Sequence, residues 1–261
     1  MTIREVIAAL ERFAPLPLQE SYDNAGLQCG LTEVEVSGAL LCLDVTPEVV
    51  LEAVEKGYNL IIAHHPLLFR GIKCVADRNL VERTLRLAIK NDVAIYASHT
   101  NLDNVRGGVN YEIAQRLGLN SPQILRPLVG HADAGSGVLA EWETPLSAYV
   151  ALQHIKAVFK ADCVMHNALL ERPIKRVALC GGSGSFLCQD AVAAGADLFL
   201  TGEMGYHDFF GWEGQIQLAV IGHYESEQYT LHLLERVLAK ALPQLRIRHT
   251  AVNRPNPVHY L

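Results

Sequence analysis

Histidines and carboxylates follow directly on three short apolar segments of this 261-residue chain. They are His64, His65, His99, Asp103, His223 and Glu227. Imidazole nitrogens and carboxylate oxygens suit several transition metals, so the ligand types do not distinguish Zn, Fe, Mn or Ni. A single catalytic zinc ion takes three or four ligands. Five or six groups are enough for two divalent ions, about 3.5–4 Å apart, that share a bridging carboxylate. The residue types therefore predict a dinuclear metal centre.

Position in the chain separates these histidines from the others. A single histidine is more often a core or surface residue than a ligand, and we assign no role to six of the eleven. Those six are His131, His154, His166, His232, His249 and His259. Among the candidates, the doublet His64-His65 before Pro66 is the more specific signal, and each pair of a histidine with a carboxylate four residues later is weak taken separately.

The apolar segments in front of the candidate ligands are typical of buried parallel strands. They are Asn59–Ala63, Val93–Ala97 and Leu218–Ile221. In open α/β sheets, functional residues collect at the carboxyl ends of the strands. Adjacent residues on a continuing strand point to opposite faces. Because Pro66 disfavours continuation, we expect the chain to leave the sheet there and to turn both imidazoles toward one site.

Strands and helices alternate along the rest of the chain, which favours an α/β fold with largely parallel sheets. The predicted helices are Thr2–Phe13 with Thr2 as its cap, Pro47–Lys56 after the cap Thr46, Glu82–Asn91, Val109–Leu117, Pro145–Phe159, a helix that ends at Gly195, and Gln228–Leu242. The further predicted strands are Ala39–Val45, Gly135–Glu143, Cys163–His166, Lys175–Cys180, Asp197–Thr201 and Arg246–Val252. Ser21–Gly30 is typical of a polar loop punctuated by glycine.

The two halves of the chain resemble each other. Leu41–His65 aligns without a gap with Leu179–Glu203, and Val93–Asp103 aligns with Gln217–Glu227. Strand, helix, terminal glycine and second strand coincide in the first pair, and the histidine and carboxylate coincide in the second. Any two strand–helix–strand units share this alternation, so chance similarity is the alternative. We predict two similar α/β domains with the dinuclear metal site in the cleft between them: 1–125 plus about 216–261 (discontinuous), and 126–215.

Composition excludes several classes of protein. With 28 acidic and 22 basic side chains the formal net charge is −6, which argues against nucleic-acid binding by the exterior. A chain with 50% hydrophobic and 19% charged residues is not disordered. We find neither an apolar run long enough for a membrane span nor a signal-peptide pattern. The six cysteines contain no C-x-x-C pair and are typical of reduced structural thiols. We therefore expect a cytoplasmic protein.

Several motifs together resemble the GTP cyclohydrolase 1 type 2 family, also called the Ngg-interacting-factor-three-like family. The motifs are IIAHHPLLFRGIK, SHTNLDNVRGGVN, YDNAGLQCG, LCGGSGSF, TGEMGYHDF and GHYESE, and the resemblance runs to the C-terminal PNPVHYL. It implies that Glu227 bridges two ions, that His64 and His223 bind one, and that His65 and Asp103 bind the other. It also implies that His99 lies beside the ions, and that the chain assembles into a toroidal homohexamer.

Metal-dependent hydrolysis of a nucleotide or related small molecule is the function we expect. Taken at face value, the family name implies that water attacks C8 of a guanine nucleotide, with protons moved by His99, Glu203 or His207. A phosphoester hydrolase would use the same ligands. Two alternatives belong to other functional classes. One is a metal-handling or regulatory protein without turnover, and the other is a scaffold inside a ring.

One glycine-rich segment has two interpretations, a phosphate-binding loop and a structural turn. Gly181–Ser185 (GGSGS) lies between a predicted strand and a predicted helix. Its backbone N–H groups could cradle a phosphate. The segment matches neither G-x-G-x-x-G nor the P-loop, so a tight strand–helix turn is the favoured interpretation.

Overall fold

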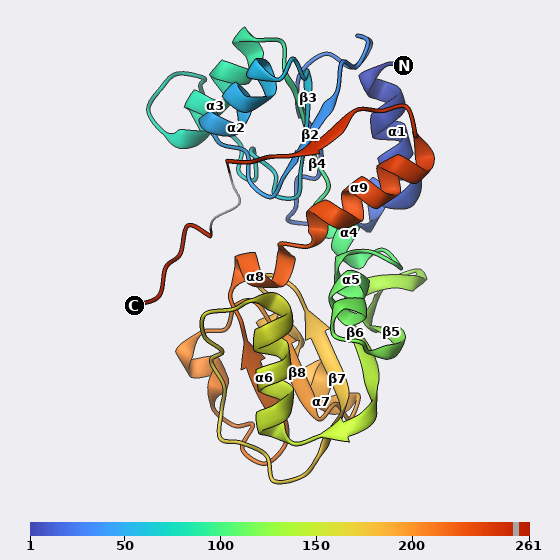
Figure 1. Cartoon of the computed structure of the whole chain (residues 1–261), viewed down its shortest axis with the longest axis vertical. Helices are drawn as coiled ribbons and strands as arrows, with labels where there is room; N and C mark the ends of the chain where they lie inside the picture. The colour runs from blue at the N-terminus through green and yellow to red at the C-terminus, as the bar shows by residue number, and fades with distance from the viewer. Residues whose placement is uncertain (253–255) are drawn as a thin grey trace. The chain divides into compact units, whose positions relative to one another are not determined.

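Two compact α/β units make up the structure, a computed structural model that describes residues 1–252 and 256–261 (Figure 1). The first unit comprises Met1–Leu102 and Thr230–Pro255, and the second comprises Asp103–Tyr229 and Asn256–Leu261. Each unit contains one five-stranded sheet. The predicted α/β class with two domains is therefore confirmed. The predicted domain boundaries, 1–125 with about 216–261 and 126–215, stay a prediction.

The sheet of the first unit has the strand order β1-β4-β3-β2-β10. Its strands are β1 (Gly26–Cys29), β2 (Ala39–Cys42), β3 (Leu60–Ala63), β4 (Ala94–Ala97) and β10 (Ile247–His249). Strands β10, β2, β3 and β4 are mutually parallel, and β1 adds to β4 in the antiparallel sense. The prediction of a loop over Ser21–Gly30 is wrong for β1, because the pairing of β1 with β4 is a long-range contact that the local polar composition does not reveal.

Helices cover both faces of this sheet: α2 and α3 lie on one face, and α1 and α9 on the other (Figure 1). Their bounds are α1 (Ile3–Phe13), α2 (Pro47–Glu55), α3 (Leu80–Lys90) and α9 (Thr230–Ala241), and a short 3-10 turn, η1, spans Leu16–Leu18. Thr2 and Glu5 form a capping box at α1, and Thr46 caps α2. Asn79 caps α3, so this helix begins before the predicted Glu82. Polar caps stabilise helix starts by satisfying N–H groups that lack partners within the helix.

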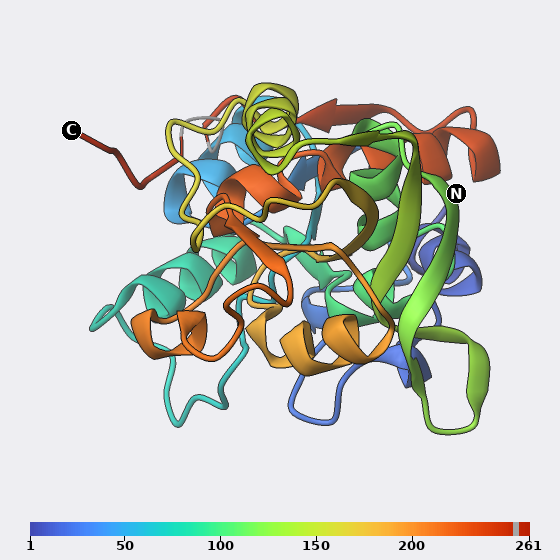
Figure 2. The same cartoon turned by 90° about the horizontal axis from the view of Figure 1, so that it is seen from below.

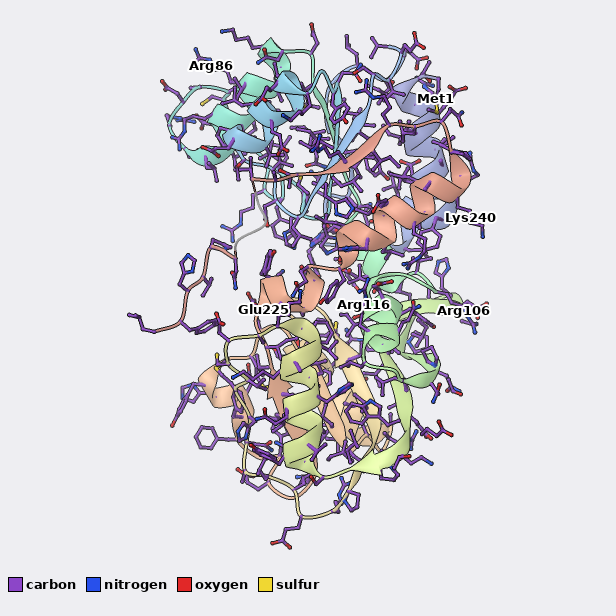
Figure 3. All side chains as sticks on the ribbon, in the orientation of Figure 1. Met1, Arg86, Arg106, Arg116, Glu225 and Lys240 are labelled. Carbon is purple, nitrogen blue, oxygen red and sulfur yellow. The ribbon has the colours of Figure 1, made fainter. Side chains whose placement is uncertain are left out.

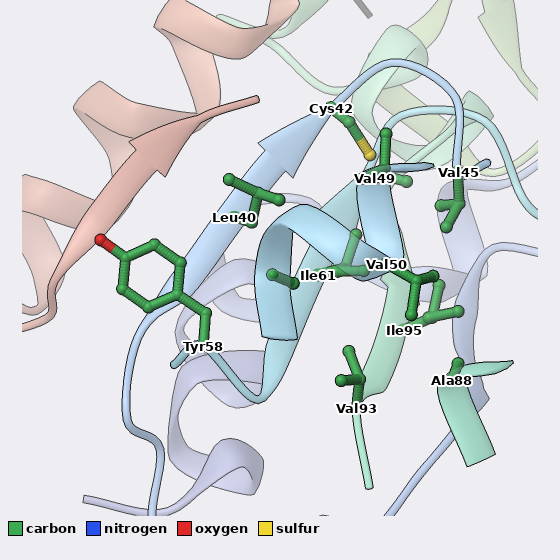
Figure 4. Close-up of a cluster of buried hydrophobic side chains, with 12 residues drawn as sticks. Leu40, Cys42, Val45, Val49, Val50, Tyr58, Ile61, Ala88, Val93 and Ile95 are labelled. Atoms are coloured by element: carbon green, nitrogen blue, oxygen red, sulfur yellow. The ribbon is translucent and has the colours of Figure 1, made fainter. Parts of the chain in front are cut away.

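The apolar core under α2 and α3 is built from alternate strand residues (Figure 4). Leu40 of β2, Ile61 of β3 and Ile95 of β4 pack against Val49 and Val50 of α2, and all of them are fully buried. Burial of each such side chain contributes about 1.5–3 kcal/mol. The packing fixes the register of the strands, and with it the positions of the residues that follow their carboxyl ends.

The sheet of the second unit has the order β5-β6-β7-β8-β9. Its strands are β5 (Asn120–Leu128), β6 (His131–Leu146), β7 (Ile174–Cys180), β8 (Leu198–Thr201) and β9 (Gln217–Val220). Strands β7, β8 and β9 are parallel, while β5 and β6 form an antiparallel hairpin against β7. Strand β5 was not predicted, because it is a largely exposed edge strand with little apolar patterning.

The second unit also has helices on both faces of its sheet. Figure 2 shows α6 and α7 on opposite sides of the strands. The helices are α5 (Val109–Arg116), α6 (Ala148–Phe159), α7 (Cys188–Ala193) and α8 (His223–Glu227), with the 3-10 turns η2 (Ser185–Leu187) and η3 (Tyr206–Phe209). Helix α4 (Thr100–Asn104) contains the division between the two units.

Three predicted elements differ from the structure. The helix predicted from Pro145 begins at Ala148, because Ser147 caps it and β6 continues to Leu146. The helix predicted from Gln228 begins at Thr230, after α8 has ended. The strand predicted over Cys163–His166 is reduced to one bridge between Met165 and Val220. The other predicted elements are present, with ends that differ by a few residues. Pro255, the first residue of the PNPVHYL motif, lies outside the described residues.

The internal similarity predicted from the sequence is matched by the secondary structure. The alignment places β3 on β8, and α2 on η2 followed by α7. The glycines after the two helices, Gly57 and Gly195, have φ angles of +68° and +70°. A helix of one turn follows β4 in the first unit and β9 in the second. The same plan thus places His99 and His223 at equivalent strand ends.

Candidate metal centre

β3 ends at Ala63, and two further hydrogen bonds tie the bend at His64 and His65 to the end of β2. The amide of His64 donates to the carbonyl of Cys42 (3.1 Å), and that of His65 donates to the carbonyl of Leu43 (2.9 Å). The predicted strand end at Ala63 is therefore confirmed, and the chain bends at both histidines. The two rings lie near each other, with centroids 4.9 Å apart and planes inclined at 46°.

Hydrogen bonds hold both rings through Nδ1. Nδ1 of His64, which is fully buried, lies 2.8 Å from the carbonyl oxygen of Ser98. Nδ1 of His65 lies 2.9 Å from Oδ1 of Asp44. Because both partners are acceptors, Nδ1 carries the proton in the neutral ring. Nε2 is then the nitrogen through which each ring would bind a metal ion, the arrangement typical of metal-ligating histidines.

His99 is the third imidazole of this group. Its Nδ1 lies 2.7 Å from Oδ1 of Asp23. Its ring centroid lies 5.3 Å from that of His64 and 5.6 Å from that of His65. Three imidazoles therefore gather at the carboxyl ends of β3 and β4, and each of them is held at Nδ1 by an oxygen acceptor.

Two aromatic side chains border this histidine group. The ring of Phe69 lies 6.1 Å from that of His99 and 6.4 Å from that of Tyr22. Both aromatic side chains are substantially exposed, at 45% for Phe69 and 61% for Tyr22. Asn24 donates from its side chain to the carbonyl of Leu68 (2.8 Å), which ties together the two loops that carry these rings. The first unit thus presents flat aromatic surface beside His99.

A second group of candidate ligands lies within the second unit. Nδ1 of His223 lies 3.0 Å from Oε1 of Glu203, and its Nε2 lies 3.1 Å from Oε2 of Glu227. Glu227 is buried, whereas Glu203 is exposed and also accepts a hydrogen bond from the hydroxyl of Ser183. Burial raises the pKa of Glu203, but the Ser183 hydrogen bond and the charge of His223 outweigh it and lower the pKa below its ordinary value.

Glycine is required beside His223 and Glu227. Gly182 has a φ of +59°, and a Cβ built on it would meet the carboxylate of Glu227 and lie 3.3 Å from Nε2 of His223. Gly222, with φ of +102°, would place its Cβ against the carboxylate of Glu225. Both positions combine a positive φ with a close approach, so a Cβ there would be strained and would displace the neighbouring carboxylate.

Two predicted site residues remain, Asp103 and His207, and each lies on a different short helix. Asp103 lies on α4, and its carbonyl accepts a hydrogen bond from Asn110 (3.1 Å). His207 is exposed on η3, where its ring contacts those of Tyr206 and Phe210. A role of either residue at a metal centre stays a prediction.

The GGSGS segment is a tight turn between β7 and η2. Its backbone N–H groups donate to side chains of the same unit: Gly181 to Asn110 (2.9 Å), Gly182 to Ser226 (2.9 Å) and Gly184 to Thr201 (3.0 Å). Since these donors serve the fold, the geometry favours the structural interpretation over a phosphate cradle.

Comparison with known proteins identifies the family. Residues 1–257 match Duf34/NIF3 (NGG1p interacting factor 3). The chain belongs to the Duf34/NIF3 family. A GTP cyclohydrolase 1 type 2 homolog of Clostridium perfringens is 36% identical over 228 residues, which are 87% of each chain. NIF3-like protein 1 of Drosophila melanogaster is 31% identical over 242 residues, 91% of this chain and 82% of the relative.

A solved structure has the same fold as this Duf34/NIF3 chain. The crystal structure of a hypothetical protein of Staphylococcus aureus superposes with a TM-score of 0.92 at 30% identity. The superposition covers 100% of this chain and 99% of the other. The family and the two-unit α/β fold predicted from the sequence are therefore confirmed. In the part of this Duf34/NIF3 chain that the structure describes, no helix is long and apolar enough to cross a membrane.

Three functional candidates of this Duf34/NIF3 protein were missed by sequence reasoning. Asp23 and Asp44 hold imidazoles, and Gly182 makes room for His223 and Glu227. Asp44 follows β2, so the strand-end rule could have found it had the strand not been predicted to run to Val45. Asp23 lies far from His99 in the sequence and has no comparable signal.

Proposed function

We propose that this Duf34/NIF3 protein is a metal-dependent hydrolase that holds two divalent ions and acts on a nucleotide or related small molecule. One observation carries the proposal. Each of the four histidines at the strand ends has its Nδ1 held by an oxygen acceptor, which is the carbonyl of Ser98 or the carboxylate of Asp44, Asp23 or Glu203. Metal-ligating histidines typically have such an acceptor at the ring nitrogen that does not bind the ion.

Five residues are the proposed ligands. His64 and His223 would bind one ion, His65 and Asp103 the other, and Glu227 would bridge them. In this proposal His64, His65 and Glu227 together form a group that could hold a metal ion. The donor set fits, because neutral imidazoles and carboxylates suit Zn, Fe, Mn or Ni.

The chemistry divides between the ions and the side chains. When bound, two divalent ions supply Lewis acidity and lower the pKa of water. Nε2 of His99 would accept a proton and return it to the leaving group, with Glu203 or His207 as further proton carriers. Phe69 and Tyr22 offer flat apolar surface beside His99, which suits a substrate that contains an aromatic ring.

Turnover after metal reconstitution tests the proposal. The purified chain would be loaded with Mn, Zn or Fe and assayed on a panel of nucleotides and phosphoesters. We expect the wild type to hydrolyse a member of the panel and His64→Ala to lose this activity. His131→Ala is the control, because His131 is an exposed histidine to which we assign no role, and it should keep the activity. A chain that binds metal but hydrolyses no compound of the panel would contradict the proposed hydrolase activity and favour a metal-handling protein.

We also propose that the chain is a cytoplasmic homo-oligomer, a toroidal hexamer as the family resemblance implies. The six cysteines are thiols, which fit a reducing compartment. Small-angle scattering of the purified protein is expected to give six times the mass of one chain. A mass near the 28.7 kDa of a single chain would contradict the hexamer.

A further inference from the structure

The most fully hydrogen-bonded carboxylate beside the histidine group is that of Asp23. Its side chain is fully buried, whereas that of Asp44, which holds His65, is 63% exposed. A buried carboxylate is retained only where its lone pairs are satisfied. Asp23 lies in the loop before β1 and joins this loop to the end of β4, where His99 and Thr100 follow the strand.

Four donors surround the Asp23 carboxylate. Oδ1 accepts from the amide of Asn24 (2.6 Å) and from Nδ1 of His99 (2.7 Å). Oδ2 accepts from the amide of Thr100 (3.0 Å) and from the Thr100 hydroxyl. Burial raises the pKa of Asp23, but the hydrogen bonds from His99 and Thr100 outweigh it and lower the pKa to about 2. The carboxylate is therefore ionised at neutral pH.

The direction of these bonds determines the state of the His99 ring. An ionised carboxylate can only accept, so His99 must carry its proton on Nδ1. The amides of Asn24 and Thr100 donate to the two carboxylate oxygens and hold the carboxylate in the orientation in which Oδ1 faces the His99 ring. Nε2 of His99 is left as the basic nitrogen, on a ring 5.3 Å from that of His64 and 5.6 Å from that of His65.

We propose that Asp23 is the positioning residue for His99: it fixes the Nδ1–H tautomer and the ring orientation, so that Nε2 serves as the proton acceptor of the reaction. The catalytic part of this inference rests on the proposed hydrolase function. The tautomer does not, because it follows from the hydrogen bonds of the chain itself. In catalytic histidine–aspartate pairs on other folds, the aspartate has the same role.

A purely structural role is the alternative. Asp23 accepts from Thr100 at the start of α4 and could serve only to tie the loop to that helix. Thr100→Val separates the two roles. It removes the hydroxyl bond to Asp23 and keeps the acceptor at Nδ1 of His99, so the loop is loosened while the tautomer is unchanged.

Nitrogen-15 NMR of the imidazoles in the metal-free chain tests the tautomer directly. The His99 signals would be assigned by their loss in His99→Gln. We expect a protonated Nδ1 in the wild type and in Thr100→Val, and a mixture of both tautomers in Asp23→Asn and in Asp23→Ala. An Nε2–H ring in the wild type, or an unchanged ring in both Asp23 variants, would overturn the proposal.

Kinetics of the metal-loaded enzyme test the consequence for the reaction. We expect Asp23→Asn to lower kcat by about 10²–10⁴-fold, the typical contribution of a positioned general acid or base. KM and the number of ions per chain should stay near the wild-type values. Loss of bound metal in Asp23→Asn would make His99 a ligand and overturn the positioning role. Absence of wild-type turnover would overturn the proposed hydrolase, while the NMR result still decides the tautomer.

Discussion

At the scale of single residues, the candidate centre depends on the side chains behind the predicted ligands. His65 is held by Asp44, an exposed residue that no sequence motif singled out. We predict that Asp44→Asn weakens metal binding by about 10–100-fold, because the amide orients His65 less firmly and no longer raises its basicity. Metal titration by calorimetry measures the change. Asp133→Asn, at an exposed ion pair with Arg106, is the control, and equal affinities in both variants would contradict the role of Asp44.

A second residue-scale prediction concerns the glycine beside His223. Gly182→Ala forces a methyl group against the carboxylate of Glu227, while Gly57→Ala has a similar φ and no neighbour within 4 Å. Both variants pay about 1–2 kcal/mol for the left-handed backbone. We therefore expect similar losses in the free energy of unfolding, and a tenfold or greater loss of metal affinity in Gly182→Ala only. Unchanged metal affinity in Gly182→Ala would show that Glu227 is not a ligand.

The Asp23 carboxylate predicts a dependence of stability on pH. Its pKa of about 2 in the folded chain lies below the ordinary value of 3.8. As the pH falls, the unfolded chain takes up the proton first. The stability from Asp23 is thus complete above about pH 4 and is lost as the pH falls through about 2. The difference in unfolding free energy between wild type and Asp23→Asn should shrink over this interval, as measured by urea denaturation. A difference that stays constant would contradict the assignment.

At the scale of secondary-structure elements, a buried carboxylate fastens the last strand of the first unit. Glu52 on α2 accepts hydrogen bonds from the hydroxyl of Thr250 and the amide of Ala251, directly after β10. We predict that Glu52→Ala lowers the free energy of unfolding by about 1–3 kcal/mol, because these donors lose their acceptor in a buried position. Glu55→Ala, on the exposed side of the same helix, should change it by less than about 0.5 kcal/mol. Equal effects in urea denaturation would contradict the anchoring role.

Elements with a local signal could be predicted from the sequence. Thr2, Thr46 and the glycine at position 57 mark helix ends by capping chemistry and backbone freedom, and the structure has helix ends there. Strands β1 and β5 have no such signal, because they exist through pairing with β4 and β6. Helix α8 was not predicted, because its five residues, His223–Glu227, have little apolar patterning.

In the candidate site, too, only the residues with a local sequence signal could be predicted. The strand-end rule found the histidines, and it could do so because buried parallel strands have strong apolar patterns. Their partners are brought by loops, as Asp23 is to His99, and a contact between loops distant in sequence has no periodicity to reveal it. The orientation of the side chains was likewise out of reach. The rings of His64 and His65 lie near each other on the bend that follows β3.

At the scale of the whole molecule, the two units repeat one plan on a similar sequence pattern. Figure 3 shows charged side chains over both units, among them Arg86 and Lys240 of the first and Arg106, Arg116 and Glu225 of the second. The formal net charge is −6. In the proposed centre, Asp103 and Glu227 are ligands, so two divalent cations would offset part of this charge. The loaded chain would then be less acidic than its composition indicates, and would attract anionic groups to the centre.

The central claim is that these residues hold two metal ions, and elemental analysis of the purified, metal-reconstituted chain tests it most directly. We predict about two ions per chain in the wild type and in His131→Ala. The double variant Asp103→Ala, Glu227→Ala should lose both ions while its circular dichroism spectrum stays that of the folded protein. A folded wild-type chain that retains no metal after reconstitution, or a double variant that still holds two ions, would contradict the claim.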